Sequence, residues 1–283
     1  MENYIKLMRP KHWVKNLLIF LPSALASEFD KLISIDCILA FFSMSFVASA
    51  VYILNDIKDV QKDRLHPRKK YRPIATGNIT VKAAFQLSIL LIIISFFIAS
   101  QINFNAFATI IVYFLLNLLY SNILKQIKFI DIVVLSSFYL LRLYLGSVAN
   151  DTALTGWFIA TMTMAFLTLS LNKRYAELKI MRNTASMGRG YNINDSTLLG
   201  IAMINTALIT LVFLNIHASF ILKIDNPMFY GFLNLLTTFI IFQYFDDNKN
   251  NSDDPVHRIT SNPLLIMSLT IVIGLYLFEL LTH

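Results

Sequence analysis

Residues 37–54 read CILAFFSMSFVASAVYIL, and residues 55–74 read NDIKDVQKDRLHPRKKYRPI. The first run is apolar and of membrane-spanning length, whereas the second is dense in charged side chains that are costly to place in hydrocarbon. The whole chain continues this contrast, since 56% of its residues are hydrophobic and only 14% are charged. Soluble domains have roughly a quarter of their residues charged. With a mean hydropathy of +0.61, the sequence predicts a polytopic membrane protein.

Nine apolar runs of spanning or near-spanning length predict an all-α fold. They leave no room for a soluble domain, so we expect one integral membrane domain over residues 1–283, built as a bundle of nine transmembrane helices. The single cysteine, Cys37, cannot form an internal disulfide. The runs cover residues 13–27, 37–54, 83–100, 104–120, 129–149, 153–171, 197–221, 228–245 and 262–281.

Lysines and arginines are distributed unevenly between the ends of these runs. If the N-terminus lies in the cytoplasm, nearly all of the 24 basic residues fall in cytoplasmic segments, and Lys31 and Lys223 fall in external ones. The positive-inside rule therefore predicts a multi-pass protein of the cell (inner) membrane, with its N-terminus and active site on the cytoplasmic side. The net charge of +7 then suits anionic substrates or lipid headgroups, and nucleic-acid binding is not needed to explain it.

Acidic residues recur at helical spacing in the charged block. If the helix continues beyond Leu54, then Asn55, Asp59 and Asp63 lie on one face over about two turns. Oxygen ligands in a line suit Mg²⁺, which shares its remaining coordination sites with waters and substrate phosphates. We therefore expect these three residues to bind Mg²⁺ and to be catalytic. Asp56 lies one position round the helix, where it is a further candidate for catalysis and for a second ion. A loop that only fixes topology would explain the basic residues but not the aligned acids.

A basic loop follows the acids. Pro67 and Pro73 are expected to stop the helix and to hold cationic side chains on a loop that can wrap the phosphates neutralised by the metal. The candidate phosphate ligands in this segment are Arg64, His66, Lys69, Lys70 and Arg72.

The pattern NDxxDxxxDxxHPxxxxRPIxxG, which begins at Asn55, resembles the first signature of the UbiA superfamily of intramembrane prenyltransferases. Two further segments resemble one branch of that superfamily, the decaprenyl-phosphate phosphoribosyltransferases. They are RPxxWxKN at residues 9–16 and YSxxLK at residues 120–125. In that branch YSxxLK is associated with substrate phosphates, so the resemblance implies phosphate binding by Tyr120 and Lys125. Lys11 and Lys15 fit either lipid-phosphate binding or simple anchoring at the membrane surface.

A third segment, KRxxE at residues 173–177, is similar to the same branch. Prenyltransferases with aromatic acceptors normally have a second DxxxD motif near this point, and the sequence has none here. Lys173 and Arg174 can instead hold a phosphomonoester directly. The plainer alternative is one more basic cluster beside the membrane. A basic, glycine-containing loop at residues 182–191 could close over a substrate.

Arg142 is a charged residue deep inside a predicted span. Arg142 is roughly twelve residues into the fifth run, or about 18 Å along a helix, where an unpaired charge would be costly. Asp131 is three turns away, too far for a direct pair. We therefore expect the partner of Arg142 on another helix or in a substrate, as an interhelical structural contact or as a phosphate ligand.

The resemblance implies a function as well as a fold. The nine helices would surround a central cavity open to the cytoplasm, and the reaction would be Mg²⁺-dependent transfer of a 5-phosphoribosyl group from 5-phosphoribosyl 1-diphosphate to a polyprenyl phosphate. Pyrophosphate would leave, and the product would be a lipid-linked ribose 5-phosphate for cell-envelope polysaccharide synthesis. A homo-oligomer is compatible with this class.

Two alternatives stay open at this point. One is UbiA-type prenyl transfer from a polyprenyl diphosphate to an aromatic or other small acceptor, which would use the same first motif. The other is a membrane transporter, since polar residues inside a helical bundle also mark ion and solute paths. The sequence favours the transporter less, because we find no matching halves or interrupted helices in it.

Overall fold

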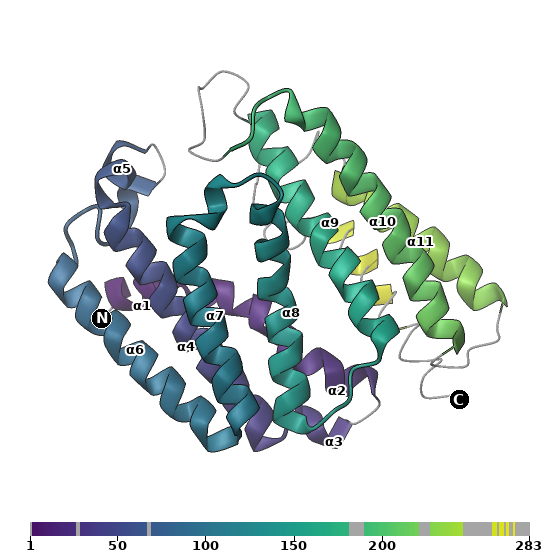
Figure 1. The fold of residues 1–283 in the computed structure, drawn as a ribbon, viewed down its shortest axis with the longest axis horizontal. Helices are drawn as coiled ribbons and strands as arrows, with labels where there is room; N and C mark the ends of the chain where they lie inside the picture. Colours follow the sequence, from purple (N-terminus) through teal and green to yellow (C-terminus); the bar gives the residue numbers. More distant parts are fainter. Residues whose placement is uncertain are drawn as a thin grey trace. The chain divides into compact units, whose positions relative to one another are not determined.

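The computed structural model describes residues 2–26, 29–66, 69–180, 190–220 and 227–245, together with residues 262–264, 266–268, 270, 271 and 274. Every regular element in these residues is helical (Figure 1). The elements are α1 (Glu2–Met8), η1 (Pro10–Phe20), α2 (Leu21–Leu25), α3 (Phe29–Leu32), α4 (Ile35–Lys58), α5 (Val60–Leu65), η2 (Lys69–Tyr71), α6 (Val81–Ile102), α7 (Phe104–Asn122), η3 (Leu124–Gln126), α8 (Ile130–Asn150), α9 (Gly156–Ile180), α10 (Asp195–Phe220) and α11 (Pro227–Phe245).

The predicted all-α class is confirmed for this part of the chain. Five helices, α4, α6, α7, α8 and α10, are long and apolar enough to cross a membrane. Helix α9 continues past the apolar run at residues 153–171 into the polar turns that end at Ile180. The ninth run, at residues 262–281, lies mostly outside the described residues. The count of nine spans therefore stays a prediction.

The first predicted span, residues 13–27, is not one α-helix. It forms the 3-10 helix η1 followed by the short α-helix α2. A 3-10 helix has three residues per turn, so Trp13, Asn16 and Ile19 share one face. Asn16 and Ile19 are buried, and the Trp13 indole donates to a hydroxyl on α4. The spacing of these three residues explains why the 3-10 form suits this segment.

Polar side chains start several of the long helices. The Ser34 hydroxyl accepts from the Cys37 amide at the start of α4, and the Thr80 hydroxyl accepts from the Ala83 amide at the start of α6. Asn103 does the same for α7, because its carboxamide oxygen accepts from the Ala106 amide at 2.8 Å. Each contact satisfies an amide that the first helical turn leaves without a partner.

Contacts between helices divide the chain into two compact units. The first unit contains residues 1–124 and 141–153. Within it α4 packs against α6, α7, η1 and α1. Helices α4 and α6 meet through small buried residues, since the Ser43 hydroxyl donates to the Ser95 carbonyl at 2.9 Å and the Ser95 hydroxyl donates to the Ser43 carbonyl at 2.7 Å. The core of this unit contains Leu7, Ala50, Ile53, Ile74, Ile79, Ala84 and Leu91.

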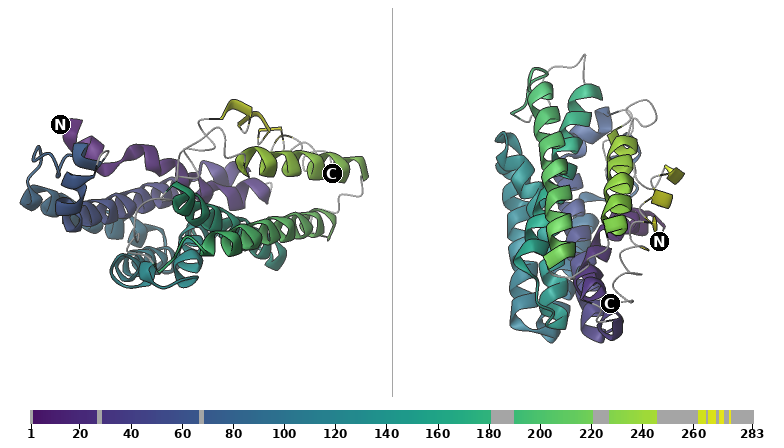
Figure 2. Two further views of the ribbon diagram at one scale, coloured as in Figure 1. Left: turned by 90° about the horizontal axis from the view of Figure 1, so that it is seen from above. Right: turned by 90° about the vertical axis from the view of Figure 1, so that its right-hand side faces the viewer.

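The second unit contains residues 125–140 and 154–283. Helices α9 and α10 pack along their length, and α11 lies alongside α10 (Figure 2). A hydroxyl contact of 2.9 Å between Thr168 and Thr206 joins α9 to α10. An amide contact of 2.8 Å between Asn215 and Asn234 joins α10 to α11. The core of this unit contains Ile132, Leu171, Leu178, Tyr191, Leu199 and Met203.

Gly146 on α8 supports a sharp test of how η1 docks in the first unit. A Cβ atom at Gly146 would lie 1.9 Å from the Ile19 carbonyl oxygen, and this neighbour is backbone that cannot rotate away. We therefore expect Gly146→Ala to cost at least ~1–3 kcal/mol of folding stability. Thermal unfolding in detergent would measure the loss.

The matched control is Gly231→Ala on α11, where no heavy atom lies within 4 Å of the added Cβ. This change should be neutral or stabilising by up to ~1 kcal/mol, since alanine favours the helix over glycine. Equal melting temperatures for the two variants would contradict the close packing of η1 on α8.

Candidate active site

Helical hydrogen bonding continues through the acidic block. Helix α4 runs past Asn55 and Asp56 to Lys58, Asp59 marks a small break, and α5 begins at Val60. Across this break the Asp59 amide donates to the Asn55 carbonyl at 2.9 Å, and the Asp63 amide donates to the Asp59 carbonyl at 2.8 Å. Helical hydrogen bonding therefore continues beyond Leu54 as far as Asp63, with a break at Asp59.

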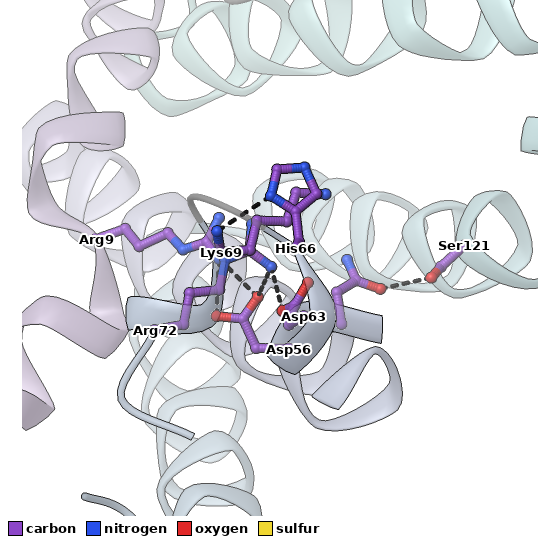
Figure 3. Close-up of polar contacts among 8 residues, drawn as sticks. Arg9, Asp56, Asp63, His66, Lys69, Arg72 and Ser121 are labelled. Atoms are coloured by element: carbon purple, nitrogen blue, oxygen red, sulfur yellow. Dashed lines mark hydrogen bonds and ion pairs between the residues drawn. The ribbon is translucent and has the colours of Figure 1, made fainter. Parts of the chain in front are cut away.

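Two of the four candidate acidic-block residues are held by arginines (Figure 3). Arg72 donates from Nη1 to Asp56 Oδ1 at 2.9 Å and to Asp63 Oδ2 at 2.6 Å. Arg9 donates from Nη2 to both carboxylate oxygens of Asp56, at 2.6 and 2.7 Å. The side chains of Asp56 and Asp63 are each only 4% exposed. A network of two acids and two arginines thus lies where α4 and α5 meet the loop before α6.

The other two residues of the block have different surroundings. The Ser121 hydroxyl donates to the Asn55 carboxamide oxygen, and Lys58 donates to the Ser121 carbonyl at 3.2 Å, which ties this turn to the end of α7. The Asp59 carboxylate is half-buried. This carboxylate makes no hydrogen bond or ion pair with any described part of the chain. Asp59 is thus the acid of the block whose oxygens are available.

The donors in this block have the chemistry that a magnesium ion requires. Carboxylate oxygens of Asp56 and Asp63 converge on one guanidinium nitrogen, and the oxygen ligands Asn55 and Asp59 lie on the same helical segment. Among the described residues, no group of three or more His, Cys, Asp or Glu side chains is gathered closely enough to hold a metal. A metal bound at Asp63 would replace the contact of Arg72 with that carboxylate, and Arg72 would keep its contact with Asp56. The assignment of the metal ligands stays a prediction. The oxygen donors present in the block are consistent with it.

Two side chains of the predicted basic loop make hydrogen bonds with nearby backbone groups. Arg64 donates from Nε to the Ala75 carbonyl at 3.2 Å, and His66 accepts at Nδ1 from the Lys69 amide at 3.2 Å. The Lys70 ammonium lies 5.2 Å from the centre of the Tyr71 ring. Arg64, His66, Lys69 and Lys70 are exposed, and Pro67 lies outside the described residues. Arg72 is the loop residue that the structure brings to the acids.

The N-terminal segment docks on one face of α4. Trp13 donates from its indole nitrogen to the Ser49 hydroxyl at 3.0 Å, and Asn16 donates to the Ser45 hydroxyl at 2.8 Å. These contacts bring Arg9 to Asp56 near the end of the same helix. Arg9 was not among the predicted ligands, although it is the first residue of the RPxxWxKN pattern. Among the lysines predicted in this pattern, Lys11 is exposed and Lys15 is partly exposed.

Arg142 is buried within the first unit, with 4% of its surface exposed. It donates from Nε to the Asn16 carboxamide oxygen at 2.7 Å and from Nη2 to the Tyr113 hydroxyl at 3.0 Å. Its guanidinium carbon also lies 5.0 Å from the centre of the Tyr113 ring. The partners predicted on other helices are therefore present on η1 and α7. A role for Arg142 in phosphate binding stays a prediction.

In the second unit, Arg174 is part of a buried ion cluster. It is 1% exposed and binds both carboxylate oxygens of Asp131, with an Nη2 to Oδ1 distance of 2.8 Å. Its Nη1 binds Glu177, three residues later on the same helix. Lys173 is partly exposed. The pairing of Asp131 with Arg174 was not predicted, because Asp131 was considered only as a partner for Arg142. The sequence did contain a signal for it, since Asp131 is a single acid at the start of an apolar run.

The start of α8 is joined to the segment before α10 in the same unit. Lys128 pairs with Asp195 at 2.7 Å, and the Phe129 amide donates to the Tyr191 hydroxyl oxygen at 2.8 Å. Burial raises the pKa of the Tyr191 phenol, so this hydroxyl stays neutral. Lys125, on η3, is partly exposed, as is Tyr120 in the first unit. Residues 182–189 of the predicted loop lie outside the described part of the chain.

The sequence profile of the UbiA prenyltransferase family matches residues 16–269. The chain belongs to this family. It is 36% identical over 188 residues to the decaprenyl-phosphate phosphoribosyltransferase of Mycolicibacterium smegmatis, a match that covers 64% of this chain and 59% of that protein. It is 38% identical over 193 residues to the enzyme of the same name from Corynebacterium glutamicum, covering 65% and 57%. The chain thus matches less than two thirds of the length of these relatives.

The fold has solved counterparts in the same family. A UbiA homologue from Archaeoglobus fulgidus, bound to GPP and Mg²⁺, aligns with a TM-score of 0.70 at 19% identity, covering 99% of this chain and 98% of that one. At this identity the likeness establishes the fold alone. Together with the apolar helices, membership of this family indicates an integral membrane protein.

The buried Asp131–Arg174 pair of this UbiA protein is expected to stabilise the fold. Asp131→Asn would leave the buried Arg174 charge short of one carboxylate, and breaking a buried ion pair costs about 3–5 kcal/mol. We expect this loss in thermal or chemical unfolding of the detergent-solubilised protein.

Asp195→Asn is the matched control, because it removes the same charge from a pair that is partly exposed. Pairs of that kind contribute about 1 kcal/mol or less. The buried-pair assignment is wrong if the Asp131 variant unfolds no more easily than the Asp195 variant.

Proposed function

We propose that this UbiA protein transfers a 5-phosphoribosyl group from 5-phosphoribosyl 1-diphosphate to a polyprenyl phosphate. The main support is the similarity to decaprenyl-phosphate phosphoribosyltransferases at 36 to 38% identity. Each unit, considered by itself, carries charged residues that would suit a phosphorylated substrate. The first unit carries the acids of the α4–α5 block with Arg9 and Arg72, and the second unit carries Lys173 on the KRxxE segment in place of a second acidic motif.

The donor diphosphate would be bound at the acidic block. Asn55, Asp59 and Asp63 would hold Mg²⁺, which when bound supplies charge neutralisation for the leaving pyrophosphate. Arg72 lies at these acids and donates hydrogen bonds of the kind that phosphate oxygens accept. The bond between the anomeric carbon and the diphosphate oxygen breaks, and positive charge develops on the ribose ring. Cationic side chains beside the leaving group stabilise the negative charge that forms there.

The acceptor would be a polyprenyl phosphate whose tail lies in the bilayer. One of its phosphate oxygens would form the new bond to the anomeric carbon, and since that oxygen is already anionic, no general base is required. The partly exposed Lys173 suits the acceptor phosphate better than Arg174, whose guanidinium is occupied by Asp131 and Glu177. The distribution of basic residues favours a cytoplasmic active site, where a soluble, charged donor is accessible.

The decisive test is whether the protein transfers the labelled phosphoribosyl group to a lipid. Membranes containing the protein should move radiolabel from 5-phosphoribosyl 1-diphosphate into an organic-extractable lipid only when polyprenyl phosphate and Mg²⁺ are both supplied. The same membranes should not prenylate 4-hydroxybenzoate when they receive a polyprenyl diphosphate. The reverse pair of results would establish prenyl transfer instead, the alternative for which the family's chemistry provides the precedent.

The metal assignment has its own test. Asp59→Ala and Asp63→Ala should each abolish turnover and remove the Mg²⁺ dependence of donor binding, since each deletes a carboxylate ligand. Membrane insertion should be unaffected, because topology depends on basic residues and not on acids. Glu2→Gln, which removes an exposed acid on α1 that pairs with Lys6, serves as the control and should leave activity unchanged. Near wild-type turnover by either alanine variant would contradict its assignment as a metal ligand.

A further inference from the structure

Asp56 differs from the other acids of the block in how completely its oxygens are used. Arg9 contacts both oxygens at 2.6 and 2.7 Å, and Arg72 contacts Oδ1 at 2.9 Å. Its side chain is 4% exposed. Asp59, by contrast, makes no side-chain contact with the described residues. Charge-assisted hydrogen bonds from two guanidiniums are strong contacts, so Asp56 is the acid least available to a metal ion.

The two arginines use only part of their hydrogen-bonding capacity on these acids. Arg9 contacts the acids through Nη2 alone, and Arg72 contacts them through Nη1 alone. The remaining guanidinium nitrogens of both side chains make no hydrogen bond to any residue in the described ranges. The side chains of Arg9 and Arg72 are 20% and 27% exposed, above carboxylates that are 4% exposed. The free donors are therefore accessible to an anion, and a planar guanidinium suits phosphate.

One carboxylate brings the two guanidiniums together. The nitrogens of Arg9 and Arg72 each lie within 3 Å of the same oxygen, Asp56 Oδ1, at 2.6 and 2.9 Å. Two like charges so close repel each other, and the negative charge of Asp56 offsets this repulsion. Once a divalent ion binds the neighbouring acids, the ion and the two arginines together carry more positive charge than Asp56, Asp59 and Asp63 carry negative charge. A bound polyanion would neutralise this excess.

The backbone conformation of Arg9 also helps to direct its side chain toward Asp56. Arg9 has φ 55° and ψ 58°, a left-handed conformation that is uncommon for residues other than glycine. Pro10 disfavours the right-handed helical conformation for the residue before it, so α1 ends here and the chain turns. The guanidinium carbon then lies 5.1 Å from the centre of the Tyr52 ring, one turn before Asp56 on α4. Tyr52 and Asp56 together determine the position of the guanidinium.

We propose that Asp56 is a positioning residue, not a metal ligand, and that it holds Arg9 and Arg72 as a pair that binds the diphosphate of the donor substrate. This inference rests on the proposed function, because it assigns the phosphate contacts of that same site. Asp56 acts through the arginines, whereas Asn55, Asp59 and Asp63 remain for the metal.

The first arm of the test measures metal binding without turnover. Mn²⁺ serves as the probe, and its affinity is measured by electron paramagnetic resonance on the purified full chain. Asp56→Asn should bind Mn²⁺ within about twofold of the wild type, and Asp59→Asn should lose binding. An Asp56→Asn variant that loses Mn²⁺ as fully as the Asp59 variant would make Asp56 a metal ligand and overturn the proposal.

The second arm measures pyrophosphate binding in saturating Mg²⁺ by calorimetry. Asp56→Asn and Arg9→Gln should each weaken binding roughly tenfold or more, the scale of a lost charged hydrogen bond. The double variant should be little worse than either single one, because the two residues act as a unit. Asp56→Glu, which restores the charge, should recover part of the affinity. Unchanged pyrophosphate affinity in Asp56→Asn would refute the proposal.

A docking control separates positioning from simple folding. Trp13→Phe removes the hydrogen bond to Ser49 that docks the same N-terminal segment on α4, and it leaves the arginine pair untouched. Its pyrophosphate affinity should match the wild type. An equal loss in Trp13→Phe would assign Asp56 to docking alone and overturn the proposal.

The two substrates are separated by their Michaelis constants. With active protein, Asp56→Asn should raise the KM for 5-phosphoribosyl 1-diphosphate and leave the KM for polyprenyl phosphate unchanged. A rise confined to the lipid phosphate would refute the donor assignment. The Mn²⁺ and pyrophosphate measurements need no turnover, so they decide the role of Asp56 even if the proposed reaction fails.

Discussion

A carboxylate that is removed from water needs a cation or several hydrogen-bond donors beside it, and this requirement shapes both units of the protein. Asp56, near the end of α4, lies between Arg9 from the N-terminal segment and Arg72 from the loop before α6. Asp131, at the start of α8, is fully buried against Arg174 on α9. In each unit the cation and the acid come from different elements. The ion pairs therefore fix where helix ends lie relative to their neighbours within the unit.

The apolar parts of the helices obey the same rule with neutral groups. Ser43 and Ser95 exchange hydrogen bonds between α4 and α6, and Asn215 contacts Asn234 between α10 and α11. Lipid provides no water to such groups, so each must find its partner inside the protein. Arg142 is the strongest case, because its charge is met by an amide and a phenol within the first unit. These small and polar residues thus mark contacts between helices.

The candidate site contains both acidic and cationic side chains. Its acids are divided between Asp56 and Asp63, which are held by arginines, and Asp59, whose oxygens are available. Such a site can bind cations and phosphates together, which is what transfer from a diphosphate requires. The chain belongs to the UbiA prenyltransferase family, and the proposed transfer is consistent with that membership.

Local patterns in the chain were enough for part of this picture. The length and composition of the apolar runs determined the helical class. The four-residue spacing of Asn55, Asp59 and Asp63 identified the acidic block, because residues four apart lie on one face of a helix. The same signatures pointed to the family. The first run was interpreted too simply, since a 3-10 face and an α-helical span have similar composition at residues 13–27.

The pairing of charges was decided by tertiary structure alone. Arg9 meets Asp56 across 47 positions, and Arg174 meets Asp131 across 43 positions. No local pattern encodes such partners, because they meet only when separate elements pack together. For the same reason the sequence could name the four polar residues of the block but not divide them into paired and available ones. The sequence determined which chemical groups the site has, and the packing of η1, α4 and the loop before α6 determined which of them remain free, because a buried charge takes the partner that folding brings within reach.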